Sequence, residues 1–470
     1  MSFKGSTYGS WLVADTATQL GSSLRQFAFP VLALLVSGSA SMAGNIGALM
    51  AFTVAALSLA GGVLVGRYDR RRLLLASCAF TAVVFTCASL WGFLWGISVP
   101  LLFAVGVAVA VKAGLLGSAS NVLLRSVVPT ESLPQAMSVN QGRDAAVELS
   151  GGPLSGALVA VSHVAPFVAE VALNLVAFLA ALRIRPWAEA NRQQDRAASQ
   201  GSAPENTPPD TSAGQPDSEA PAAVEDATSA VASFFVEALA GVRFIFSSRF
   251  ILRLTVASAL FMPLLNGVIL LLVLGVISRG GSPISAGLLN SAVAVGVLAG
   301  SLLSAKLVGR IPAGRIALAA FLLPVPCALG AVLVPWFWLR MLCLLPVPCA
   351  LGAVLVPWFW LRMLCLLPIL VLLPAGNASV GGFGMTVVPQ EMLGRFFSVM
   401  GLMGVLVTPL VTLSVGYGLQ YLGLRATGLV LGAALLASAL FAVANRQMRE
   451  IPTPDGWQEY ARKINLRPAE

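Results

Sequence analysis

Charged residues are scarce in this sequence: Asp, Glu, Lys and Arg together make up only 10% of its 470 residues. A soluble domain carries about 25%. Hydrophobic residues reach 57%, which is more than a water-soluble fold can bury, so the excess predicts a membrane protein with many spans. A soluble enzyme, a nucleic-acid-binding domain and a disordered chain are therefore excluded as descriptions of the whole protein.

Metal-binding and catalytic patterns are missing as well. The single histidine, His163, rules out a two-histidine metal site within one chain. The sequence has no zinc-protease helix motif, no glycine–lysine phosphate loop and no GxSxG. The six cysteines lie in apolar runs without a CxxC pair, as core or lipid-facing residues do. We therefore expect a protein that is not an enzyme and holds no cofactor and no metal.

One segment, residues 187–233, interrupts the apolar pattern with acidic residues and prolines. It has too few apolar side chains to form a core, so we predict a disordered, acidic cytoplasmic linker. Apolar runs long enough to span a membrane, about 20 residues or more, precede and follow it. They lie at about 9–37, 42–65, 73–97, 100–123, 137–161 and 164–183, and then at 250–278, 283–308, 315–335, 341–388, 393–418 and 424–444.

These runs predict an all-α polytopic membrane protein. We expect an N-terminal six-helix bundle over 1–186 and a C-terminal six-helix bundle over 234–470. Basic residues gather after the even-numbered runs, most densely at 67–72 and at the end of the chain. Because cytoplasmic loops carry the excess of Lys and Arg, both termini and the linker are expected in the cytoplasm.

Two repeats occur along the chain. The pattern VPxExLxxxxSV starts at Val128 and returns at Val388, which relates the halves as in one large class of secondary transporters. The other repeat is literal, because residues 322–343 are copied letter for letter in 344–365. The identity implies a recent duplication or a sequencing artefact. A thirteenth span would place the basic tail outside, so we expect a re-entrant, peripheral or distorted segment.

The loop after the second run, residues 62–72, reads GVLVGRYDRRR and resembles the signature loop of the major facilitator superfamily. The stretches DTATQLG at 15–21 and VPTESLPQAMSVNQGR at 128–143, with Phe29-Pro30, are similar to its bacterial efflux branch, which exports drugs, macrolides and siderophores. The resemblance covers nearly the whole chain except the linker and the copied segment. It implies twelve helices in two bundles, related by a pseudo-twofold axis around a central cavity, that work by alternating access.

The resemblance also implies residue roles. In the signature loop, Gly66 stands where the family usually carries an acid that latches the outward-facing state, and Asp69 is the possible substitute. The basic residues of the loop can bind lipid phosphates or helix C-termini, or serve only to anchor the topology. The loop residues that the resemblance connects with gating are Gly62, Gly66, Arg67, Asp69, Arg70 and Arg71.

The fifth run contains GGPLSGA at 151–157, which resembles the antiporter signature of drug exporters. Glycines allow close helix contact, and a proline bends the helix that contains it. An exporter-type hinge and ordinary packing glycines are both open interpretations. The residues concerned are Gly142, Gly152, Pro153 and Gly156.

Ionisable residues inside the predicted spans are the candidates for transport chemistry. Each costs about 2.5–3.5 kcal/mol near the bilayer centre unless it faces a cavity or a partner. The candidates for proton coupling or for lining the cavity are Asp15, Arg25, Lys112, Arg143, Asp144, Glu148, Glu170 and Asn174.

Asp144 and Glu148 stand four residues apart on one helix face, where their carboxylates repel and a proton relieves the repulsion. Arg143 or Lys112 is expected to neutralise this pair. Asp15 and Arg25 lie about 15 Å apart along one helix and are not expected to pair. As coupling or substrate-binding acids we rank Glu148 first, then Asp15, Glu170 and Asp144, with a structural ion pair as the alternative for each.

The sequence thus predicts a secondary active transporter that exports a small amphiphilic molecule, such as an antibiotic, a siderophore or another secondary metabolite, in exchange for protons. We expect a monomer in the bacterial plasma membrane, with membrane lipid as a further partner and no nucleic acid. The alternatives are an importer or uniporter of a small metabolite, a non-transporting membrane sensor, and a relic impaired by the duplication. The substrate itself is not encoded in a motif, because polyspecific cavities are built from generic side chains.

Overall fold

In the computed structural model, helices and the turns between them make up the residues that it describes. These residues are 6–117, 120, 123, 133–184, 249–308, 310–326, 374–377, 379, 381, 383, 390–457 and 459–460. The predicted linker at 187–233, the copied segment at 344–365 and residues 327–343 of the segment that it repeats lie outside this set.

The described part of the N-terminal half contains six long helices that follow the predicted apolar runs, and α4 differs most because it ends at Leu116. These helices end where Gly, Ser and Asp interrupt the apolar pattern. Asp69 caps the start of α3, because its side chain accepts a hydrogen bond from the Arg71 backbone N–H at 2.9 Å. The helices are α1 (Ser6–Ser37), α2 (Ala40–Arg67), α3 (Arg70–Trp95), α4 (Val99–Leu116), α6 (Leu133–Val161) and α7 (Ala165–Leu182).

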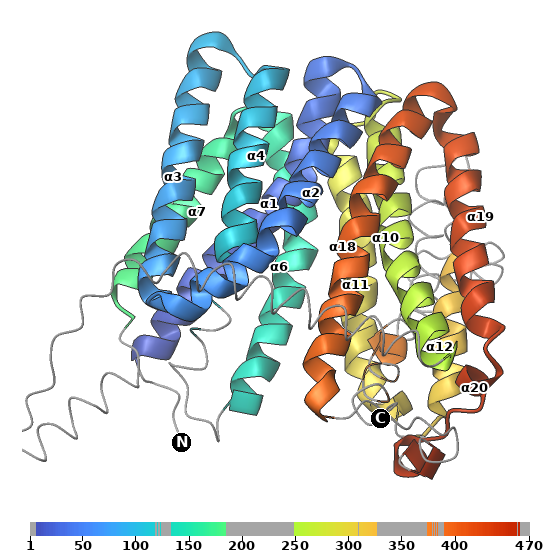
Figure 1. Ribbon diagram of the computed structural model, residues 1–470. Helices are drawn as coiled ribbons and strands as arrows, with labels where there is room; N and C mark the ends of the chain where they lie inside the picture. Colours follow the sequence, from blue (N-terminus) through green and yellow to red (C-terminus); the bar gives the residue numbers. More distant parts are fainter. Residues whose placement is uncertain are drawn as a thin grey trace, which may run out of the picture.

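The C-terminal half forms a second group of helices beside the first (Figure 1). Seven helices of the described chain are long and apolar enough to cross a membrane, so the protein is an all-α polytopic membrane protein. The elements of this half are α10 (Arg249–Ile277), α11 (Pro283–Val308), α12 (Ala313–Leu322), α18 (Gln390–Tyr421), α19 (Gly423–Val443), α20 (Arg446–Arg449) and a 3₁₀ turn (Pro454–Gly456).

The two ends of the molecule differ. At one end, which we call the hairpin end, short turns join α1 to α2, α3 to α4 and α18 to α19; the described part of the chain begins and ends at the opposite, terminal end (Figure 1). Exposed aromatic side chains mark the hairpin end. The ring centres of Trp91 and Trp95 in α3 lie 4.8 Å apart, and those of Tyr417 and Tyr421 in α18 lie 6.2 Å apart. Trp and Tyr favour the level of the lipid headgroups, so this level is one membrane interface.

The halves approach each other closely at two places near the hairpin end. Between α2 and α18, a Cβ added to Gly44 would lie 2.8 Å from the Cα of Gly416. Between α6 and α11, a Cβ added to Gly152 would lie 2.7 Å from the carbonyl oxygen of Gly287. Only glycine permits such backbone contact, which gains dispersion energy where lipid supplies no hydrophobic force. We call these four residues the glycine seam.

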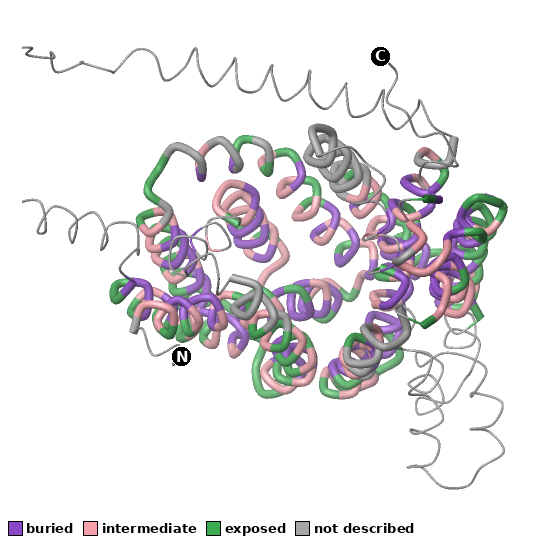
Figure 2. Tube along the Cα trace, turned by 90° about the horizontal axis from the view of Figure 1, so that it is seen from below, coloured by how far each residue is buried: buried purple, intermediate pink, exposed green. Residues whose placement is uncertain are grey.

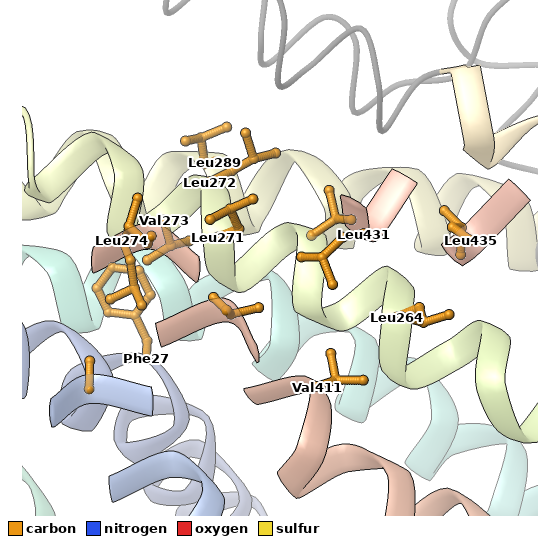
Figure 3. Close-up of a cluster of buried hydrophobic side chains, with 14 of the residues drawn as sticks. Phe27, Leu264, Leu271, Leu272, Val273, Leu274, Leu289, Val411, Leu431 and Leu435 are labelled. Atoms are coloured by element: carbon orange, nitrogen blue, oxygen red, sulfur yellow. The ribbon is translucent and has the colours of Figure 1, made fainter. Parts of the chain in front are cut away.

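Apolar side chains from both halves form one buried cluster. Phe27 of α1 belongs to it together with Leu271 and Leu274 of α10 (Figure 3). Seen along the helices, buried positions lie largely between the helices and many exposed positions lie on their outer sides (Figure 2). The exposed positions are often large and apolar, for example Phe93, which is 69% exposed. This arrangement is the one that a lipid environment requires.

The chain after α19 folds back onto the C-terminal half. Backbone carbonyls of Ile451 and Pro452 accept hydrogen bonds from the first N–H groups of α12, at 3.1 and 3.2 Å. Met448 and Ile451 are fully buried, and the rings of Trp457 and Tyr460 pack against Phe383. The tail, which the sequence suggests only as a basic anchor, therefore stabilises the terminal end of this half by satisfying the unpaired donors of α12.

Candidate functional site

A buried ion pair joins α1 to α7 in the middle of the N-terminal half. Nη1 of Arg25 lies 2.7 Å from both carboxylate oxygens of Glu170, and only 8% and 1% of the two residues is exposed. Asn174, one turn further along α7, donates from Nδ2 to Oε2 of Glu170 at 2.9 Å. The carboxylate thus accepts hydrogen bonds from two side chains, which offset the hydration that a buried charge loses.

The backbone of α1 leaves room for this carboxylate. A Cβ at Gly21 would lie 2.8 Å from Oε2 of Glu170, so a larger residue there would displace the carboxylate. The guanidinium of Arg25 also lies 5.9 Å from the centre of the Phe85 ring. Sequence reasoning selected Arg25, Glu170 and Asn174 separately, and the fold brings them together.

Lys112 of α4 lies near this ion pair. It is half-buried and close enough to interact electrostatically with Arg25 and Glu170, but it reaches no described carboxylate at ion-pair distance. Of the two cations expected to neutralise Asp144 and Glu148, Arg143 or Lys112, Lys112 is therefore not the one in contact with Asp144. The helix order does not reveal which face of α4 meets which neighbour, and packing turns this lysine toward α1, α3 and α7 instead.

A second charged cluster joins α1 to α6 nearer the terminal end. Nη2 of Arg143 lies 2.6 Å from Oδ2 of Asp15 and 2.6 Å from Oδ1 of Asp144. The hydroxyl of Ser120 donates to the other Asp15 oxygen, and the Trp11 ring lies 5.7 Å from the guanidinium. Arg143 does neutralise Asp144, as expected, and Asp15 and Arg25 do not pair, also as expected. The Asp15–Arg143 contact was not foreseen.

Between these clusters, a cavity of about 180 Å³ opens between α1 and α6. Sequence reasoning missed its α1 wall because the side chains are uncharged, although their spacing of i, i+3, i+4 and i+7 in an apolar span is a readable signal. The lining residues are Gln19, Ser22, Ser23 and Gln26 of α1 and Asp144, Val147 and Glu148 of α6.

Glu148 differs from the other acids in the spans. It is exposed and has no ion pair or hydrogen bond to any residue that the structure describes. Four residues further along α6, Gly152 touches Gly287 of the other half. Because residues four apart share a helix face, Glu148 lies on the face of α6 that is turned toward the second half.

Comparison with known proteins agrees with this architecture. Residues 12–406 match the Major Facilitator Superfamily. The chain belongs to this superfamily. It is therefore a secondary transporter and not an enzyme, and like other members it acts on a small molecule, often together with protons in this superfamily. None of the curated proteins matches the sequence.

Solved structures of other transporters share the fold. A bacterial homologue of the iron transporter ferroportin in an inward-facing state is 15% identical, with a TM-score of 0.59 over 94% of this chain and 99% of that chain. A bacterial homologue of the human lysosomal transporter Spinster is 15% identical over the whole of both chains, with a TM-score of 0.57. The xylose transporter XylE from E. coli is 13% identical over 97% of this chain and 99% of that one, with a TM-score of 0.59.

The antiporter-like glycines of this major facilitator protein lie mostly at the contact between the halves. Gly152 belongs to the glycine seam, and Gly156 contacts the Pro283 backbone of α11. Pro153 lies inside α6, and a Cβ at Gly142 would meet nothing within 4 Å. These small residues therefore set how closely α6 approaches α11, except for Gly142, which is outside the contact.

The signature loop of the superfamily connects helices within the N-terminal half. Asp69 lies 3.6 Å from Arg72, and Arg71 donates from Nη2 to the Leu182 carbonyl at the end of α7, at 2.6 Å. A cation at a helix C-terminus is favoured by the helix dipole and satisfies an unpaired carbonyl. Of the other loop residues only the helical backbone is described: Gly62, Gly66, Arg67 and Arg70.

Proposed function

We propose that this transporter exports a small amphiphilic molecule in exchange for protons, by alternating access. The proposal includes twelve spans, with six-helix bundles over 1–186 and 234–470 joined by a cytoplasmic linker over 187–233. It also includes a monomer in the bacterial plasma membrane with both termini in the cytoplasm. An antiporter that removes antibiotics or other secondary metabolites would confer drug resistance on its host.

The observation that carries the proposal is the unpartnered Glu148 in the cavity between α1 and α6. A proton-coupled transporter needs an acid that water reaches on one side and that is free to change its protonation state. Asp144, four residues away and 50% exposed at its side chain, adds a second negative charge on the same face. Proton uptake relieves the repulsion between the two carboxylates.

The glycine seam supports the alternating-access part. Contact between the halves near the hairpin end favours a cavity that opens toward the terminal end, which is the cytoplasmic side in the proposed topology. Release of the seam and approach of the terminal ends would then expose the cavity to the other side. Glu148 lies one helical turn from Gly152 of the seam, so its access to water changes when α6 moves against α11.

The other embedded acids support the structure in this proposal. Asp15 and Glu170 are buried and paired with cations from other helices, Arg143 and Arg25. Such pairs hold α1 against α6 and α7 while the halves move as rigid units. Of the four acids ranked from the sequence, Glu148 is the one proposed for proton coupling.

The test is gradient-driven transport in proteoliposomes, with a substrate found by a drug-susceptibility panel in an efflux-deficient host. We expect Glu148→Gln to abolish accumulation driven by a pH gradient and to leave downhill exchange intact. Glu450→Gln is the matched control, because Glu450 lies outside the spans and pairs only with Arg446 among described residues. Unchanged gradient-driven transport in Glu148→Gln would remove this residue from the mechanism, and transport without any gradient dependence would favour the uniporter.

A further inference from the structure

The charges around the cavity between α1 and α6 do not cancel. Asp15, Asp144 and Glu148 contribute three carboxylates, whereas Arg143 contributes one guanidinium that already contacts Asp15 and Asp144. With all four groups ionised, the excess is two negative charges. The proposed transport function leaves open which chemical class of substrate would meet this excess.

The other cations of the half do not serve the cavity. Arg25 lies between Ser22 and Gln26 in the sequence, but it is buried and paired with Glu170, whereas those two neighbours are exposed to the cavity. Lys112 interacts with that same ion pair from α4. On the second half, residues 283–298 of α11, which contacts α6 at Pro283 and Gly287, include no charged residue. Within the described chain, the cavity therefore lacks a further counter-charge.

The uncharged wall of the cavity fits a nitrogen donor. Gln19 and Gln26 offer amide oxygens and Ser22 and Ser23 offer hydroxyl oxygens, all of which accept hydrogen bonds. These residues form one row along α1, opposite Glu148 of α6. A volume of about 180 Å³ admits the headgroup of an amphiphile and a few carbons, with the apolar remainder outside. An anionic headgroup there would face the excess carboxylates without a free cation.

We propose that this cavity binds the protonated amine headgroup of an amphiphilic substrate, with Glu148 as its counter-charge and the Gln–Ser row of α1 as its hydrogen-bond acceptors. The proposal rests on the transport function stated above and specifies its substrate class. Because the amine and a proton neutralise the same carboxylate, bound amine and bound proton exclude each other at Glu148. This competition would couple the two movements.

The test is equilibrium binding to the purified full-length protein in nanodiscs, without any gradient. The probes share one arylalkyl skeleton and end in a primary amine, an alcohol or a carboxylate. We expect the amine to bind at least about tenfold more tightly than the alcohol, which corresponds to one well-placed charge pair, and the carboxylate to bind most weakly. Glu148→Gln should remove the advantage of the amine, and binding of the alcohol that persists in this variant shows that it is folded. Glu450→Gln should keep the advantage.

Two results would overturn the proposal. One is that the alcohol or the carboxylate binds as tightly as the amine, or that none of the probes binds. The other is that the amine keeps its advantage in Glu148→Gln. The experiment is independent of proton coupling. If the amine is preferred but a pH gradient drives no transport, the substrate class stands and the proposed proton exchange fails. If a gradient drives transport of a neutral molecule and the amine has no advantage, the proposed proton exchange stands and the proposed substrate class fails.

Discussion

Glu170 and Glu148 are two carboxylates in the spans of one half, and their surroundings are opposite. Glu170 is 1% exposed and receives donors from Arg25 and Asn174. Glu148 is exposed in a cavity and contacts no described cation. A buried carboxylate that has all its donors holds helices in place, whereas a carboxylate that keeps an open side can exchange a proton or a ligand. The difference separates residues that hold the transporter together from residues that can do its work.

The largest effect is expected from removing the buried carboxylate. Glu170→Gln leaves the guanidinium of Arg25 without its counter-charge, which costs about 3–5 kcal/mol in comparable buried pairs. We expect a marked loss of thermal stability in detergent and low yield of folded protein, measured by a thermal shift assay. The double variant Arg25→Met/Glu170→Leu should recover much of the stability, because it removes both charges. A stable Glu170→Gln protein that fails only in transport would instead assign Glu170 to the mechanism.

A smaller effect is expected at the seam, on the same face of α6 as Glu148. In Gly152→Ala the new methyl group meets the Gly287 carbonyl, and the forced separation of α6 and α11 costs about 1–3 kcal/mol. Substrate transport should fall accordingly while the helix content, measured by circular dichroism, stays the same. Gly142→Ala is the matched control on the same helix, because its methyl group meets nothing. Equal losses in both variants would favour a hinge that includes Gly142 over the seam.

Deleting the second tandem copy, residues 344–365, tests whether this segment contributes to transport, since it belongs neither to the buried ion pair nor to the cavity. In the proposed twelve-span plan the copy is an insertion, so its removal should preserve transport of the substrate found by the susceptibility panel. Activity that appears only after the deletion would identify the natural chain as an impaired relic. Loss of activity would give the copy a role of its own.

The smallest effect is expected from the linker. Replacing residues 187–233 by a flexible Gly/Ser chain of equal length should leave transport nearly unchanged, since a tether contributes reach and not contacts. The measurement is the initial rate of gradient-driven transport in proteoliposomes. A severalfold decrease would show that the acidic side chains act on the rest of the protein.

Hydropathy located the N-terminal helices because an apolar run of spanning length is a local property of the chain. The same local signal selected Asp15, Arg25, Arg143 and Glu170 as embedded charges. It could not pair them, since Arg25 and Glu170 stand 145 residues apart in the sequence. The choice between Arg143 and Lys112 stayed open for the same reason: the face of α4 that meets α1 is decided by packing and not by the sequence of α4 alone.

The site shows a different kind of omission. Gln19, Ser22, Ser23 and Gln26 carry no charge, so a search for ionisable residues passed over them. Their helical spacing in an apolar span could have indicated a polar face. The seam glycines were visible as a motif, but an exporter hinge and simple packing look identical until the opposite backbone is known.

By itself, the sequence determined that this protein is a polytopic membrane protein, because composition and the length of apolar runs leave lipid as the only solvent, and its signature loop at 62–72 carried the resemblance to the major facilitator superfamily. It also determined which acids had to be explained, because each embedded charge is costly. Only the tertiary structure decided which acids are satisfied and which are not. That outcome depends on which helices become neighbours, and distant parts of the chain meet only when their small residues let the backbones approach.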